Sequence, residues 1–231
     1  LHPERLHEPG YLTDVIEEHQ RGRFLTSTPF KVVNPERWAL RAVNARSGQA
    51  LPASGPPQPG LICAMLNDDL QQVEQQLHVR PERVESGLLS LFGAVYSRIG
   101  RRENIRAVAV VVIHKIATTV YILGKDGVHT PSPLLHGFAS IVDAARTELG
   151  LEEHSEVRHH LHEGHAVLRK QADKLVRRIA RELKPVVDSY EMTTGEPVGE
   201  IFCAYLPPTL AWLGEPLAKV TGCAPMEIDC H

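Results

Sequence analysis

The sequence predicts an α/β protein, because β-branched apolar runs alternate along the chain with segments of helical periodicity. The most informative run, Ala107 to Ile113, is continuously apolar, too short to cross a membrane and too unbroken for a half-exposed strand. A second apolar run, Ala117 to Leu123, follows the polar pair His114-Lys115, and Asp126-Gly127 then predicts a tight turn. We therefore expect an antiparallel hairpin whose first strand is central and buried on both faces.

Length and composition are those of a globular protein with one or two domains: 231 residues, of which 42% are hydrophobic and 23% charged. The formal net charge of -3 gives no general attraction to nucleic acid or anionic lipid, so such binding would need a local patch. The four cysteines form no Cys-x-x-Cys pair, which favours a reducing cytosol over a disulfide framework or a zinc site. There is no signal peptide and no apolar run long enough to cross a bilayer, so we expect any membrane association to come through a partner. The start at Leu1, without a methionine, is compatible with a segment of a longer protein.

The N-terminal part predicts a helix followed by a small α+β unit. The apolar spacing from Tyr11 to Phe24 fits one face of a helix, and Arg37 to Ala42 alternates like a strand with one exposed face. The proline-rich stretch 52–60 is expected to be a surface loop or a linker. A strand is expected at Leu61 to Leu66, followed by a helix that begins at Asn67. The apolar stripe of that helix would consist of Leu70, Val73 and Leu77.

This small unit continues to the central hairpin. A short strand is expected around Val84, and Leu88 to Ile99 has the composition of a buried helix. Polar residues at 101–104 would link the unit to the hairpin. The resulting order of strand, strand, helix and strand predicts a separate subdomain.

Beyond the hairpin, the sequence predicts two helices and a closing α/β segment. The first helix would run from Gly137 to Gly150, with Gly150 as its C-terminal stop. A long amphipathic helix would begin near Ala166, and Pro185 is expected to kink or end it. The remaining expected elements are a strand at Glu200 to Tyr205, a helix at Thr209 to Val220 stopped by Gly222, and a terminal strand at Met226 to Ile228.

A histidine cluster precedes the long helix and is the strongest candidate for a metal site. His159, His162 and His165 recur every three residues, a spacing that places them on one helical face, with His154 and His160 nearby. However, His162-Glu163-Gly164-His165 is one residue short of the zinc-protease helix motif, and no cysteine lies near it. We therefore interpret the cluster as a solvated surface and expect no metal ligand in the chain.

The order of elements resembles the PilM family, the actin-like cytoplasmic proteins of type IV pilus assembly. Nearly the whole chain takes part, and the collinear order carries the resemblance because no single motif is specific. The similar segments are Pro29-Phe30, Leu61 to Asn67, Val79 to Glu85, Val111 to Leu123, Gly137 to Glu156 and Ile201 to Asp229.

The resemblance implies a partial actin-like (ribonuclease H-like) fold with a small inserted α+β subdomain. Residues 1–24 would be a linking helix, and 25–100 the small subdomain with its following helix. Residues 101–231 would be the second large actin-like subdomain, with a helical part at about 152–200.

The sequence departs from the family where the nucleotide would bind. The family's first nucleotide strand and loop are absent, and Ile113, Lys115 and Ala117 replace the carboxylate and glycines of the second hairpin. Thr118-Thr119 match, but the segment from Cys203 to Leu206 replaces a glycine run, where side chains would fill the nucleotide's volume. Without the carboxylate no obvious group would hold magnesium, so we expect no ATP hydrolysis and no bound cofactor.

By the resemblance, the residues left to contact a nucleotide are Lys115, Thr118, Thr119, Lys174 and Arg177. The alternatives are ordinary: a turn lysine is usually solvated, and threonines suit strands for packing reasons. Lys174 and Arg177 belong to a basic helix face that also contains Arg169, Lys170, Arg178 and Arg181. We interpret that face as the solvent side of an amphipathic helix, with Glu182 paired to Arg178 four residues earlier.

The resemblance implies a cytoplasmic scaffold in the inner-membrane platform of a type IV pilus or a type II secretion machine, where the L-type cytoplasmic domain is a close variant. Its partner would be the cytoplasmic N-terminal peptide of a bitopic platform protein, bound on Phe30 to Ala42 and Leu61 to Leu77. Membrane association would be indirect, and homo- or hetero-oligomers are compatible with this role. No nucleic-acid signature, Walker loop or Rossmann glycine pattern occurs.

Two other functions remain open. An active actin-like or sugar-kinase-like ATPase would need an upstream phosphate loop outside this chain, and only then would ATP and magnesium be cofactors. Ile113 and Tyr205 argue against it. A cell-division actin homologue would usually carry a membrane-binding amphipathic tail, and none follows Ile228.

Overall fold

The computed structural model describes residues 1–23, 34–44, 49–58, 60–77, 87–99, 106–131 and 133–228. The chain divides into two compact units, Leu1–Ala94 and Val95–His231. The strand predicted around Val84 and the polar link at 101–104 lie outside the described residues.

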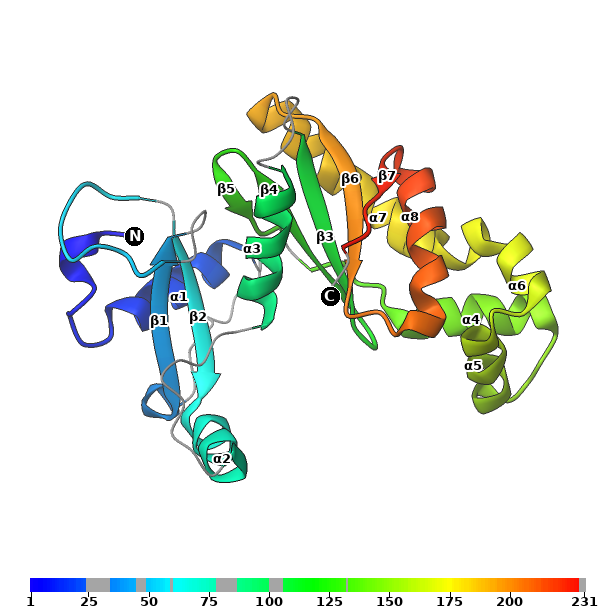
Figure 1. The fold of residues 1–231 in the computed structure, drawn as a ribbon, viewed down its shortest axis with the longest axis horizontal. Helices are drawn as coiled ribbons and strands as arrows, with labels where there is room; N and C mark the ends of the chain where they lie inside the picture. Colours follow the sequence, from blue (N-terminus) through cyan, green and yellow to red (C-terminus); the bar gives the residue numbers. More distant parts are fainter. Residues whose placement is uncertain are drawn as a thin grey trace. The chain divides into compact units, whose positions relative to one another are not determined.

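The first unit contains a two-stranded antiparallel sheet and short helices, labelled in Figure 1. Its strands β1 (Trp38–Asn44) and β2 (Gly60–Leu66) pair from Trp38 opposite Leu66 to Asn44 opposite Gly60. Both strands and the irregular stretch before β2 were predicted from the sequence. The helices are η1 (Pro3–Arg5), α1 (Tyr11–Arg23), η2 (Pro35–Arg37), α2 (Asn67–Leu77) and α3 (Gly87–Ile99), of which α3 continues into the second unit.

Helix α2 forms where predicted, but its apolar stripe is not buried. Val73 and Leu77 are 37% and 54% exposed, and no residue of α2 is buried. Asn67 directs its side-chain amide to the carbonyl of Glu36 at 3.0 Å, while Arg37 pairs with Asp68. Periodicity correctly predicted the helix, but it does not specify which neighbour covers the apolar face.

The second unit is built on a five-stranded mixed sheet in the order β5-β4-β3-β6-β7. The central strand β3 (Ala107–Ile113) pairs antiparallel with β4 (Thr118–Gly124) and parallel with β6 (Val198–Ala204). Residues 107–111 of β3 are fully buried, as the continuous apolar run predicted. The expected tight turn joins β4 to β5 (Gly127–His129), with Gly127 at φ 121°. The last strand, β7, is Ala224–Pro225, so the terminal strand predicted at Met226 to Ile228 is wrong in its position.

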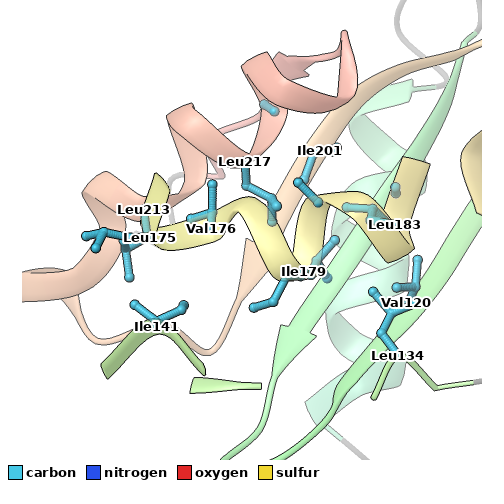
Figure 2. Close-up of a cluster of buried hydrophobic side chains, with 14 of the residues drawn as sticks. Val120, Leu134, Ile141, Leu175, Val176, Ile179, Leu183, Ile201, Leu213 and Leu217 are labelled. Atoms are coloured by element: carbon cyan, nitrogen blue, oxygen red, sulfur yellow. The ribbon is translucent and has the colours of Figure 1, made fainter. Parts of the chain in front are cut away.

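Helices pack on one face of this sheet. They are α4 (Phe138–Leu149), α5 (His154–Glu163), α6 (Ala166–Lys170), α7 (Ala172–Thr194), η3 (Pro208–Leu213) and α8 (Gly214–Thr221). Figure 2 shows Leu175 and Ile179 of α7 directed into a core shared with Ile141 of α4, Leu217 of α8 and Val120 of β4. Because α7 contributes to so much of this core, it fixes the positions of its neighbours.

The long amphipathic segment differs from the prediction in two ways. The helix is interrupted at Gln171, which separates α6 from α7, and Pro185 lies inside α7 without ending it. Pro185 is exposed, so water can satisfy the Arg181 carbonyl that has lost its amide partner. The helix instead ends at Gly195, which has a left-handed conformation with φ 68°. The helix predicted from Thr209 begins as the 3-10 turn η3, and only its second half, α8, is α-helical.

Candidate functional site

The candidate site is the edge of the second unit's sheet at the carboxyl ends of β3 and β6. The β3–β4 turn closes there with a hydrogen bond from the His114 amide to the Ala117 carbonyl at 2.9 Å. Lys115 and Ile116 form the exposed tip, and Ile116 is 72% exposed. Lys115 therefore lies in the turn, as predicted, with its side chain in solvent.

The start of α4 covers this turn on one side. The Phe138 and Ala139 amides, which a helix leaves free at its N-terminus, donate to the carbonyls of His114 and Lys115, both at 2.8 Å. Gly137 makes this approach possible, because a Cβ atom there would lie 2.5 Å from the Ala117 nitrogen and the His114 oxygen. These amides would be a natural site for a phosphate, but they are already hydrogen-bonded within the protein.

The two threonines of the hairpin have different surroundings. Thr118 is fully buried, and its hydroxyl donates to the His136 carbonyl at 2.7 Å. Its backbone forms a two-way bridge with Leu134, which attaches the segment before α4 to the hairpin. The Thr119 hydroxyl lies 3.1 Å from Nε2 of His114. Thr118 thus uses its hydroxyl to hold the chain together.

Lys174 and Arg177 lie far from this turn. Lys174 pairs with Glu148 at 3.1 Å, near the C-terminus of α4, whereas the hairpin contacts the first residues of that helix. Ten residues of α-helix separate Phe138 from Glu148, a rise of about 15 Å. Arg177 is exposed, and no hydrogen bond or ion pair joins it to another described residue. The structure brings Lys115, Thr118 and Thr119 together on the hairpin, but it does not bring Lys174 to them.

The segment after β6, expected to face the base of a nucleotide, keeps an unusual backbone. Tyr205 has φ 58°, in the left-handed region that a glycine adopts at little cost, and its side chain is 64% exposed. Burial raises the pKa of the neighbouring Cys203 thiol to about 12, so this cysteine is not a nucleophile at neutral pH. Apart from the comparison with a glycine run, no residue pattern indicated this positive φ.

The histidines are distributed around the α5–α6 turn. His159 lies 3.1 Å from Glu163, His162 is 2.8 Å from the Thr209 hydroxyl, and the rings of His160 and His165 meet edge to face at 5.1 Å. Among the described residues, no three His, Cys, Asp or Glu side chains are arranged to hold a metal ion. The cluster instead connects α5 with η3 and α6.

Sequence reasoning missed the residues that close the turn, which are Gly137, Phe138 and Ala139. From the sequence, Gly137 is identifiable only as the start of a helix. The available signal was a glycine directly before a helix in a chain whose hairpin turn lacks glycine, but the partner of that glycine is more than twenty residues away.

No protein-family model matches the sequence, and no curated protein matches it. Solved structures do match the fold. A chain of the "PilM-PilN type IV pilus biogenesis complex" superposes with a TM-score of 0.53 at 16% identity, covering 92% of this chain and 62% of that one. The "ethanolamine utilization protein EutJ from Carboxydothermus hydrogenoformans" gives a TM-score of 0.37 at 17% identity, covering 53% of this chain and 44% of the other. This chain therefore spans about three-fifths of the length of the pilus protein it resembles.

Over the described residues, no helix combines the length and the apolar character needed to cross a bilayer. The five-stranded mixed sheet, the helices on its face and the superposition over 92% of the chain agree with the architecture predicted from the order of elements. The chain therefore has a partial actin-like fold, which it shares with a chain of the PilM-PilN complex.

Proposed function

We propose that the chain is an actin-like component of type IV pilus assembly that acts as a scaffold and does not hydrolyse ATP. It would work in the cytoplasm, at an inner-membrane platform that it reaches through protein partners. The likeness to a chain of the PilM-PilN complex over 92% of this chain supports a pilus role. A type II secretion platform would use the same fold in the same position, and the experiments below apply to both.

One observation carries the scaffold assignment: the α4 amides that could bind a phosphate donate to the hairpin turn. A phosphate at this edge would have to displace the bonds from Phe138 and Ala139 to the turn carbonyls. It would then meet those two carbonyl oxygens, which repel an anion. No carboxylate follows β3 to orient a magnesium ion, since the turn is His114-Lys115-Ile116-Ala117. The residues present at this edge therefore do not fit a magnesium nucleotide.

The proposed partner is the cytoplasmic N-terminal peptide of a platform membrane protein. The structure describes residues 34–42 and 61–77 of the predicted surface, which apart from Asn34 belong to η2, β1, β2 and α2. Helix α2 presents Val73 and Leu77 to solvent, although such residues are usually covered. An apolar helix face of this kind is a common docking site for a short peptide.

Calorimetry with magnesium ATP tests the scaffold assignment. The titration would use this chain and, if the gene encodes residues ahead of Leu1, the longer protein as well. We expect neither heat nor a thermal shift from either form. Micromolar binding by the longer form that is lost in a Thr118→Val, Thr119→Val double variant would contradict the proposal and favour a working ATPase.

A separate experiment tests the peptide partner. Labelled peptides covering the cytoplasmic N-termini of single-span proteins encoded beside this gene would be titrated by fluorescence anisotropy. Leu77→Asp should weaken binding at least tenfold, because it places a charge in the apolar stripe. Gln75→Asp adds the same charge on the opposite side of α2 and should have little effect. If both variants bind like the wild type, the peptide does not use α2.

A further inference from the structure

The outward face of α7 carries three arginines that pair with no acidic group among the residues that the structure describes. Arg177, Arg178 and Arg181, named here the arginine triad, are all exposed. No hydrogen bond or ion pair joins them to another residue that the structure describes. They fall within five consecutive positions, about 6 Å of helix rise, in a chain whose net charge is -3. The positive charge is therefore concentrated locally.

The acidic residues of α7 are all engaged away from the triad. Asp173 accepts from Lys219 and Asp188 from Lys184, both at 3.1 Å. Glu191 accepts from the Val198 amide at 2.8 Å. Glu182, which the sequence predicted to pair with Arg178, instead accepts from the Leu135 amide at 2.7 Å. The triad therefore has no acidic partner within its own helix.

The core fixes the direction of the triad. Leu175, Ile179 and Leu183 are buried against the sheet and the neighbouring helices, as Figure 2 shows. With 3.6 residues per turn, the triad lies on the opposite side of the same helix. Helix α7 is 23 residues long, and its packing keeps the three positions on its outward face.

We propose that the arginine triad binds the phosphate groups of an anionic lipid surface. Arginine presents a planar fork of donors that fits phosphate oxygens in a bidentate arrangement. Clusters of exposed cations bind anionic membranes with little dependence on the identity of the lipid. This adds a direct lipid contact to the indirect membrane association of the scaffold, and it depends on neither nucleotide nor peptide binding.

The surroundings of the triad favour lipid over an acidic protein partner. Protein interfaces are built around a buried apolar or aromatic centre. In the described chain, the exposed large apolar residue of α7 is Met192, about 16 Å of helix rise beyond Arg181. Leu135, whose amide donates a hydrogen bond to Glu182, is 82% exposed and lies at the margin of the triad's surface. One marginal leucine provides no interface centre, but it suits a membrane surface, into which single apolar side chains insert.

Vesicle co-sedimentation of the chain alone tests the proposal. The vesicles would contain phosphatidylcholine, either pure or with about one-third phosphatidylglycerol, at about 0.1 M and about 0.5 M salt. We expect binding only to the anionic vesicles and only at the lower salt. Replacing the triad by Arg177→Gln, Arg178→Gln and Arg181→Gln should lower the partition coefficient about 100-fold, since each cation near the surface contributes about fivefold. Glutamine has nearly the helix propensity of arginine, so the variant should fold, which circular dichroism would verify.

The matched control removes the same number of charges elsewhere, by Arg5→Gln, Arg37→Gln and Lys219→Gln. These cations are exposed and already paired with Glu8, Asp68 and Asp173. The control should keep vesicle binding within about threefold of the wild type, because a cation that is already paired with a carboxylate should contribute little to binding the vesicle. Equal losses in both variants would show attraction by net charge alone and overturn the proposal. Unchanged binding by the triad variant, or no preference for anionic vesicles, would overturn it as well and leave the triad to an acidic protein partner.

Discussion

The hydroxyl of Tyr190 donates a hydrogen bond to the buried carboxylate of Glu196 at 2.8 Å. The backbone amide of Lys125 also points to this carboxylate, 3.2 Å from each oxygen. Gly124 leaves space for the Tyr190 hydroxyl and the Glu196 carboxylate, since a Cβ atom at residue 124 would lie 2.0 Å from the Tyr190 oxygen. These hydrogen bonds to Glu196 connect the end of α7 to the β4–β5 turn, at the opposite edge of the sheet from the candidate site.

Tyr190→Phe should lower the free energy of unfolding by about 2 kcal/mol at neutral pH, because the Glu196 carboxylate loses the hydrogen bond that the phenol donates. Burial, reinforced by the Glu196 carboxylate, raises the pKa of Tyr190 above its ordinary value. A raised pKa favours the protonated phenol in the folded state. The contribution of the Tyr190 phenol to stability is therefore complete below its pKa in the unfolded state, about 10. This contribution is lost as the pH rises through its pKa in the folded state.

Urea denaturation between about pH 8 and about pH 11 would test this dependence. The difference in stability between wild type and Tyr190→Phe should shrink as the pH rises above about 10. Tyr205→Phe is the control, because its ring is exposed and removing its hydroxyl should change stability little. A difference that stays constant over this range would contradict the assignment.

Gly137→Ala should destabilise the second unit by about 2 kcal/mol or more, because the new methyl group would meet backbone atoms of His114 and Ala117. The φ of Gly137 is -132°, so the expected cost is steric and does not come from backbone conformation. Gly214→Ala is a matched control, since its nearest contact would be the Cys203 sulfur at 3.7 Å. Chemical denaturation of both variants measures the difference. If Gly137→Ala is as stable as Gly214→Ala, α4 does not lie against the turn as described.

Tyr205→Gly should be about 1 kcal/mol more stable than Tyr205→Ala, because only glycine adopts a φ of 58° without strain. Alanine is the right reference, since it removes the same exposed ring and keeps the strained backbone. Thermal unfolding of the two variants under identical conditions gives the comparison. Equal stability would mean that residue 205 is not held in the left-handed conformation.

Thr118→Val should lower stability by about 1 kcal/mol, because it preserves the shape of the side chain but removes the donor to the His136 carbonyl. Thr119→Val should cost less, since Thr119 is only partly buried. Denaturation midpoints would measure both effects. The reverse order of cost would indicate that Thr119 holds the hairpin together. These values are also needed to interpret nucleotide titrations with the double variant.

The sequence was sufficient where local chemistry decides the structure. The apolar run from Ala107 to Ile113 predicted the central strand, and Asp126-Gly127 predicted the turn after β4. Gly150 and Gly222, predicted as helix stops, both have left-handed conformations. In these cases the deciding property belongs to a few neighbouring residues, such as a missing side chain or an unbroken apolar surface.

The sequence was insufficient where distant residues decide the structure. Nothing near Lys115 indicates that its carbonyl accepts from Ala139, because the contact depends on how the chain returns after β5. The exposure of Leu77 similarly depends on which element covers α2. Pro185 stays helical because it lies on the exposed side of a helix held by its buried face. Much of the candidate site is formed by contacts between residues that are distant in the sequence, whereas the identity of its hairpin residues could be predicted.

The parallel pairing of β3 with β6 has a consequence for the rate of folding. Val110 lies opposite Phe202, some 90 residues later, whereas its antiparallel partner Tyr121 is about ten residues away. The β3–β4–β5 meander can therefore form early, but the β3–β6 pairing must await closure of a long loop that contains four helices. Until then, one edge of β3 is an unpaired apolar strand, the kind of surface through which incompletely folded chains associate. Refolding of this protein should accordingly become less efficient as its concentration rises, even when the native state is stable.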